Sequence, residues 1–167
     1  YGPYRPTLEF SAEDFAKTLE MNMFAALHLS QRVLPGMLER GRGWIVNISS
    51  ATVKLPDGPP YIAWEQLGGH HLYGASKAAL HTFLQGLRNR LAGKGINVIT
   101  IKPGFVDTPM TAAFEKGPLW AAPETIAAGI VKAIERRRDV VYLPCFWRLI
   151  MLVVRTIPER LFKRLSL

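Results

Sequence analysis

Cysteine is nearly absent from the sequence, which contains only Cys145. A single cysteine excludes an internal disulfide and a cluster of thiol ligands, and it suits a reducing compartment such as the cytoplasm. None of the four histidines has the spacing to cysteine or to a carboxylate that is typical of zinc motifs. We therefore predict a cytoplasmic protein without a metal site.

Long apolar runs and phosphate-binding loops are also missing. The apolar run from Phe146 to Arg155 is shorter than the roughly 20 residues of a spanning helix. The sequence has no Gly-x-Gly-x-x-Gly turn, which commonly binds dinucleotides, and no P-loop, which commonly binds nucleotide phosphates. It starts at Tyr1 without an apolar leader, and we expect it to be the rear part of a longer chain.

Acidic residues are scarce, since 13 Asp and Glu oppose 21 Lys and Arg and give a net charge of +8. Most of this excess lies between Lys132 and Leu167, where nine cations oppose three acids. Such a segment suits anionic lipid or nucleic acid. Because its cations are interleaved with large aliphatic residues, we expect no nucleic-acid partner. The length of 167 residues and the apolar fraction of 49% fit one globular domain.

The stretch from Leu72 to Leu91 predicts an amphipathic helix with an unusual start. Its inward stripe steps by threes and fours, and Tyr73 and Lys77 open it one turn apart on the same face. A nearby ammonium favours the phenolate form of a tyrosine and so lowers its pKa. Tyr73 is therefore a candidate proton donor whose pKa is lowered by Lys77. Chance occurrence of the pair, with Lys77 reaching back to solvent, is the alternative. The stripe consists of Tyr73, Lys77, Leu80, Leu84, Leu87 and Leu91.

An earlier helix is predicted from Ser11 to about Leu34 or Leu38, with a capping box formed by Ser11 and Asp14. Asn22 is the polar member of its predicted inward stripe. A buried carboxamide needs partners, so Asn22 either makes a structural hydrogen bond to the backbone or holds a water near a reaction. The predicted stripe is Phe15, Leu19, Asn22, Ala26, Leu29 and Val33.

The remaining pattern alternates strands and helices and therefore predicts an α/β fold with a parallel sheet. The first strand ends in Ser49 and Ser50, and the second runs into Pro103 and Gly104, whose missing side chain would let a ligand approach the backbone. The predicted elements are a strand at 44–49, a strand at 96–101, a mobile loop at 110–122, a helix opening at Pro123 and a strand at 140–143.

Four motifs, in this order along the chain, resemble the short-chain dehydrogenase/reductase family. They are Met-Asn-Met-Phe at 21–24, Ile-Val-Asn-Ile-Ser-Ser at 45–50, Tyr-Gly-Ala-Ser-Lys at 73–77 and Ile-Lys-Pro-Gly-Phe-Val-Asp-Thr at 101–108. The resemblance spans about residues 9 to 143. It implies a Rossmann-like doubly wound parallel sheet, of which residues 1–145 supply the C-terminal half with about three strands.

The resemblance also implies the chemistry of an NAD(P)-dependent oxidoreductase that interconverts an alcohol and a ketone. Tyr73 matches the general acid/base, Lys77 the residue that tunes it and holds the nicotinamide ribose, and Ser50 the residue that positions the substrate oxygen. Asn22 matches the residue that anchors a proton-relay water. The expected cofactor is NAD or NADP, and the residues expected to bind it are Tyr73, Lys77, Pro103, Gly104, Val106 and Thr108.

Two further expectations follow from the resemblance. The first half of the family's domain, which carries the glycine-rich pyrophosphate turn, is absent, so we expect the isolated chain to be inactive. The family often pairs subunits through its two long helices, so we expect a dimer or tetramer that acts on a small apolar alcohol or ketone. The connection from Ser50 to Tyr73 is longer than the family usually shows.

Residues 146–167 are predicted to form a separate basic and apolar tail. Its composition favours an amphipathic helix at the inner face of a membrane, kinked at Pro158 and with Trp147 at the lipid boundary. The alternative is a helix that packs on the domain's own core or on a second subunit. A non-catalytic, membrane-associated remnant of the fold is the alternative function.

Overall fold

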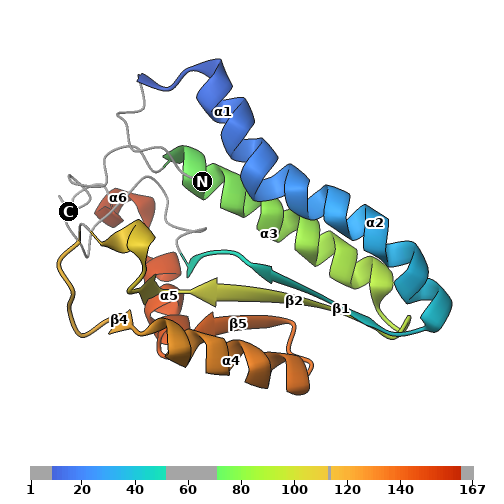
Figure 1. Ribbon diagram of the computed structural model, residues 1–167. Helices are drawn as coiled ribbons and strands as arrows, with labels where there is room; N and C mark the ends of the chain where they lie inside the picture. Colours follow the sequence, from blue (N-terminus) through green and yellow to red (C-terminus); the bar gives the residue numbers. More distant parts are fainter. Residues whose placement is uncertain (1–8, 52–70, 113, 163–167) are drawn as a thin grey trace.

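The computed structural model describes residues 9–51, 71–112 and 114–162, and it has a three-stranded parallel sheet with helices on both faces (Figure 1). The strand order is β1-β2-β5, with β1 at Gly43–Ile48, β2 at Ile96–Pro103 and β5 at Val140–Leu143. The other elements are α1 (Ala12–Leu19), η2 (Glu20–Phe24), α2 (Ala25–Arg40), α3 (His71–Leu91), β3 (Phe105–Val106), η4 (Pro109–Thr111), β4 (Trp120–Ala121), α4 (Pro123–Glu135), α5 (Trp147–Thr156) and α6 (Glu159–Phe162). The predicted α/β class is confirmed.

The central strand β2 is buried on both faces, as expected for a parallel strand covered by helices. On one face Val98 packs in a cluster with Leu84 of α3, and apolar residues of α2 extend this cluster. On the other face Ile99 packs with Ile126 of α4. The predicted leucine stripe of α3 is therefore correct, and it fixes which side of α3 faces the sheet.

The first long helix is capped by the predicted box, since the Asp14 amide donates to Ser11 Oγ and the Ser11 amide to the Asp14 carboxylate. Its predicted inward stripe is correct at Asn22 and Ala26 and wrong at Leu29 and Val33, which are exposed. The turns in η2 are wider π-helical turns, so a stripe read at constant pitch loses its register there. Phe15 is also exposed, and it precedes η2, so the change of pitch does not explain it.

The end of this helix also differs from the prediction. Pro35 lies inside α2. The helix continues to Arg40 and stops at Gly41, whose φ of 64° is the left-handed conformation typical of a helix C-cap.

Arg88 joins α3 to the sheet from the inside of the domain. Its Nε donates to the Val98 carbonyl at 2.8 Å, and its Nη2 donates to Thr100 Oγ1 at 2.8 Å and to the Asp139 carbonyl at 3.0 Å. Burial lowers the pKa of the Arg88 guanidinium, and the Asp139 carboxylate opposes this effect. The contacts hold α3 against β2 and the start of β5.

The predicted mobile loop at 110–122 contains regular structure. Trp120 and Ala121 form β4, which pairs in parallel with β3. The Phe105 and Trp120 rings lie 5.3 Å apart, and Lys116 forms an ion pair with Asp107 at 3.2 Å. Two-residue strands carry no periodic signal, so the sequence pattern could not predict them.

The C-terminal segment forms two helices rather than one kinked helix, because Ile157 and Pro158 separate α5 from α6. Trp147 is 6% exposed and packs with Met151, Val154 and Ala51, so its predicted place at a lipid boundary is wrong. The alternative, packing on the domain's own core, is confirmed for this face of α5. The domain boundary after residue 145 stays a prediction. Within 9–51, 71–112 and 114–162, no helix has the length and apolarity to cross a bilayer.

Candidate active site

Tyr73 and Lys77 lie in the first turns of α3, beside the carboxyl end of β1. The Lys77 Nζ lies 5.5 Å from the centroid of the Tyr73 ring and donates a hydrogen bond to the Ile48 carbonyl at 3.3 Å. Ile48 is the last residue of β1, two positions before Ser50. The lysine therefore reaches the edge of the sheet where ligands of open α/β folds bind, rather than extending away into solvent.

The Lys77 ammonium is only partly solvated in this position. Burial lowers the pKa of Lys77 from its ordinary value of 10.5, because the charged form loses hydration. The Ile48 carbonyl and the negative face of the Tyr73 ring offset part of this cost. The lowered pKa of Tyr73 expected from the sequence stays a prediction.

Asn22 is connected to this pair through a serine that the sequence analysis overlooked. The Asn22 Nδ2 donates to Ser76 Oγ at 3.0 Å, and Ser76 Oγ donates to the Tyr73 carbonyl at 2.7 Å. Asn22 and Ser76 are both buried. A serine that bonds back to a carbonyl three residues earlier is a common helix motif, so nothing in the local sequence marks Ser76 as the partner of Asn22. Asn22 thus makes a structural hydrogen bond, though to a serine side chain rather than to the backbone as predicted, and its role as a water anchor stays a prediction.

The two serines after β1 have different environments. Ser49 continues the ladder, because its amide donates to the Ile101 carbonyl at 2.7 Å, and its side chain is buried. Its Oγ has no hydrogen-bond partner among the described residues. Ser50, the predicted substrate-positioning residue, is half-buried. Most of the long connection to Tyr73, residues 52–70, lies outside the described residues.

The turn after β2 is held at both ends. The Gly104 amide donates to the Leu143 carbonyl at 2.9 Å. The Thr111 hydroxyl donates to the Val106 carbonyl at 2.7 Å and accepts from the Thr108 amide at 3.1 Å. Pro103, Gly104, Val106 and Thr108, the four residues predicted to bind the cofactor here, are therefore part of one ordered segment.

The indole of Trp147 occupies the space that a side chain at Gly104 would need. A Cβ at Gly104 would collide with the indole of Trp147. The Trp147 ring also packs edge-on against Phe105, with 4.7 Å between centroids. Its Nε1 is buried without a hydrogen-bond partner among the described residues. Helix α5 therefore packs, through Trp147, against the segment expected to face the cofactor. No pattern in the sequence predicts this contact.

Comparisons with known proteins identify the family to which the chain belongs. The profile of the short chain dehydrogenase family matches residues 2–118, and the chain belongs to this family. An uncharacterized oxidoreductase from Staphylococcus aureus is 31% identical over 133 residues, which are 79% of this chain and 53% of the relative. The chain therefore spans about half the length of the curated relatives it matches.

Solved structures of the family share the fold. A short chain dehydrogenase from Burkholderia cenocepacia, crystallised with NADP, superposes with a TM-score of 0.79 at 24% identity and covers 99% of this chain and 65% of that one. A short-chain dehydrogenase from Streptomyces avermitilis has a TM-score of 0.70 at 25% identity and covers 93% and 60%. The predicted Rossmann-like architecture is confirmed.

We expect the Lys77→Met variant to be stabilised more at neutral than at alkaline pH. The folded-state pKa of Lys77 lies below 10.5, so the charged side chain destabilises the native state below that folded pKa, and the cost disappears as pH rises toward 10.5. The measurement is the free energy of unfolding in urea of variant and wild type at several pH values between neutral and about 10.

Lys94→Met, which removes a lysine from an exposed turn, controls for the loss of a surface cation. A Lys77→Met effect that does not change with pH would contradict the burial of the ammonium.

Proposed function

We propose that the protein containing this chain is an NAD(P)-dependent oxidoreductase that interconverts an alcohol and a ketone or aldehyde. The observation that supports this most is the position of Tyr73 and Lys77, with Lys77 drawn to the Ile48 carbonyl at the carboxyl end of β1. A phenol and an ammonium at this edge of a parallel sheet suit the transfer of a substrate proton. Membership of the short chain dehydrogenase family supports the same reaction class.

Each residue of the site has one role in the proposal. The Tyr73 hydroxyl gives or takes the proton of the substrate oxygen, and the Lys77 charge favours the phenolate form. Ser50 donates a hydrogen bond to that oxygen and fixes its position. Asn22 anchors a water through which the proton reaches solvent, and its bond to Ser76 keeps α3 in place beside η2.

The residues present fit one end of a nicotinamide dinucleotide. The Tyr73 hydroxyl and the Lys77 ammonium can bond ribose hydroxyls, and the ordered turn at Pro103, Gly104, Val106 and Thr108 would lie against the nicotinamide. When bound, the dinucleotide supplies or accepts the hydride. The 167 residues contain no glycine-rich turn for the pyrophosphate, so tight binding requires the longer chain.

We expect Tyr73→Phe in the full-length protein to lower kcat for ketone reduction by about 10² to 10⁴, the range for losing a general acid. Cofactor binding, measured by NAD(P)H fluorescence, should weaken far less than kcat falls, because only the ribose bond of the Tyr73 hydroxyl is lost and Lys77 still bonds the ribose. The isolated 167-residue chain should show no turnover.

Tyr142→Phe is the matched control, because Tyr142 is a half-buried phenol on β5 at the same edge of the sheet. Equal activity of Tyr73→Phe and Tyr142→Phe would contradict the assignment. Activity of the isolated chain would show that the missing half is dispensable. Full-length protein that binds no cofactor would favour the non-catalytic remnant.

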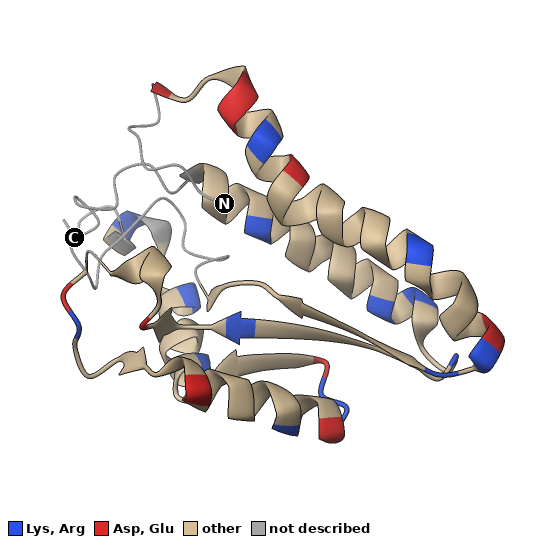
Figure 2. Cartoon of the chain, in the orientation of Figure 1, with Lys and Arg blue, Asp and Glu red and all other residues tan. Residues whose placement is uncertain are grey.

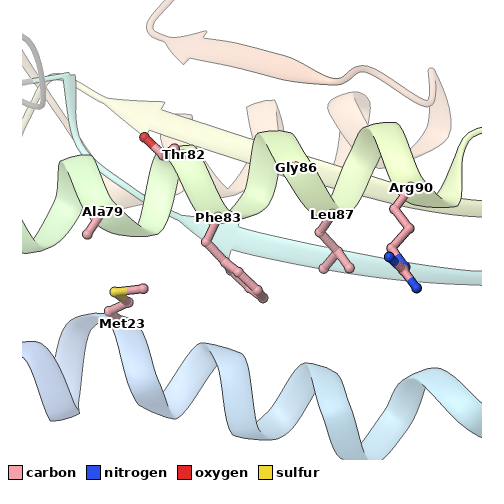
Figure 3. Close-up of a pocket in the computed structure, with 7 residues that line it drawn as sticks. All are labelled: Met23, Ala79, Thr82, Phe83, Gly86, Leu87 and Arg90. Atoms are coloured by element: carbon pink, nitrogen blue, oxygen red, sulfur yellow. The ribbon is translucent and has the colours of Figure 1, made fainter.

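We also propose that the protein forms a dimer or tetramer through the groove between η2 and α3. Met23 lies on one side of this groove, and Ala79, Phe83 and Leu87 lie on the other and point toward the facing helix (Figure 3). Leu29 and Val33 of α2 are also large, apolar and exposed. An exposed apolar groove is typical of subunit contacts.

Gly86→Arg tests this association. No atom lies within 4 Å of a Cβ at Gly86, so the monomer accepts the side chain while a facing subunit would meet it. We expect the variant to sediment as a smaller species than the wild type. Ala92→Arg, an exposed position after α3, is the control and should keep the wild-type mass. Unchanged mass of Gly86→Arg would exclude this groove as the contact.

A further inference from the structure

Helix α5 is apolar on two opposite sides. Trp147, Met151 and Val154, spaced by four and three, form its buried side. A second apolar set, which we call the outer stripe, consists of Leu149, Leu152 and Val153, which are 66%, 58% and 56% exposed. Since each helical residue turns by about 100°, the outer stripe lies opposite the buried side.

The outer stripe has no cover among the described residues. Large apolar side chains that gather on one exposed helix face are typical of an interaction surface, so the three side chains of the outer stripe indicate a contact that the described residues do not provide. Phe146 before the helix and Leu161 in α6 are also exposed, at 40% and 54%. The apolar surface thus continues along the C-terminal segment.

The charges beside the outer stripe have one sign. Arg148, Arg155 and Arg160 are exposed, and α5 contains no acidic residue (Figure 2). Between residues 146 and 167 the sequence has five Lys and Arg and one acid, Glu159. Arg148 and Arg155 lie two turns apart at one border of the outer stripe, where their stems can cover apolar surface while the guanidinium groups stay outside.

We propose that the outer stripe and these arginines dock on the surface of an anionic lipid membrane, with α5 lying in the plane of the interface. An apolar helix face bordered by cations matches this surface in both polarity and charge. Pairing of two α5 helices across a two-fold axis would place the same cations opposite each other and repel. The proposal does not depend on the catalytic assignment.

Deleting residues 146–167 is not a suitable test, because it would also remove Trp147, Met151 and Val154 from the core. The double variant Leu149→Ser/Leu152→Ser changes the outer stripe alone. Met110→Ser/Val131→Ser is the matched control, because Met110 and Val131 are also large, exposed and apolar, at 53% and 55%, but lie on η4 and α4. Thermal unfolding of both variants checks that they fold.

The experiment is co-sedimentation of the full-length protein with phosphatidylcholine vesicles, with and without about 30% phosphatidylglycerol, at low and high salt. We expect wild type and control to bind the anionic vesicles, more weakly in high salt, and the outer-stripe variant to bind at least about tenfold less. Two results would overturn the proposal: no binding by wild type, or equal binding by both variants. If wild type does not bind vesicles and the outer-stripe variant loses self-association in analytical ultracentrifugation, the stripe is assigned to a second copy instead.

Discussion

The burial of the Lys77 ammonium is the constraint on which the arrangement of the site depends. Taking a cation out of water costs free energy, and here the Ile48 carbonyl and the Tyr73 ring offset part of that cost. Both contacts exist only while α3 keeps one rotation about its axis. Two residues of α3 fix that rotation along the length of the helix: Leu84 packs in the core, and Arg88 bonds to the Val98 carbonyl of β2.

The same site depends on elements from both ends of the described chain. From the N-terminal side, the bond from Asn22 to Ser76 holds η2 against α3 at the turn before Lys77. From the C-terminal side, Trp147 fills the space that a side chain at Gly104 would need. The apolar surface that α5 leaves exposed therefore lies on the side of the helix opposite to the turn that we propose faces the cofactor.

Periodicity predicted the elements that repeat over several turns. The leucine stripe of α3 is regular over five turns, so its buried face and the Tyr73–Lys77 pair could be read from the sequence. The stripe of α2 could not, because the π-helical turns of η2 change the register. Trp147 was misplaced because a core and a lipid boundary both accept an indole, and composition does not separate them. Arg88 and Ser76 act through partners distant in sequence, which no local pattern shows.

The most direct test is a crystal structure of the full-length protein with a bound nicotinamide dinucleotide. The account predicts that the Tyr73 hydroxyl and the Lys77 ammonium both face the ribose and nicotinamide, with Lys77 still within reach of the Ile48 carbonyl. A structure in which the dinucleotide binds elsewhere, or in which Lys77 points to solvent while the cofactor is bound, would contradict it.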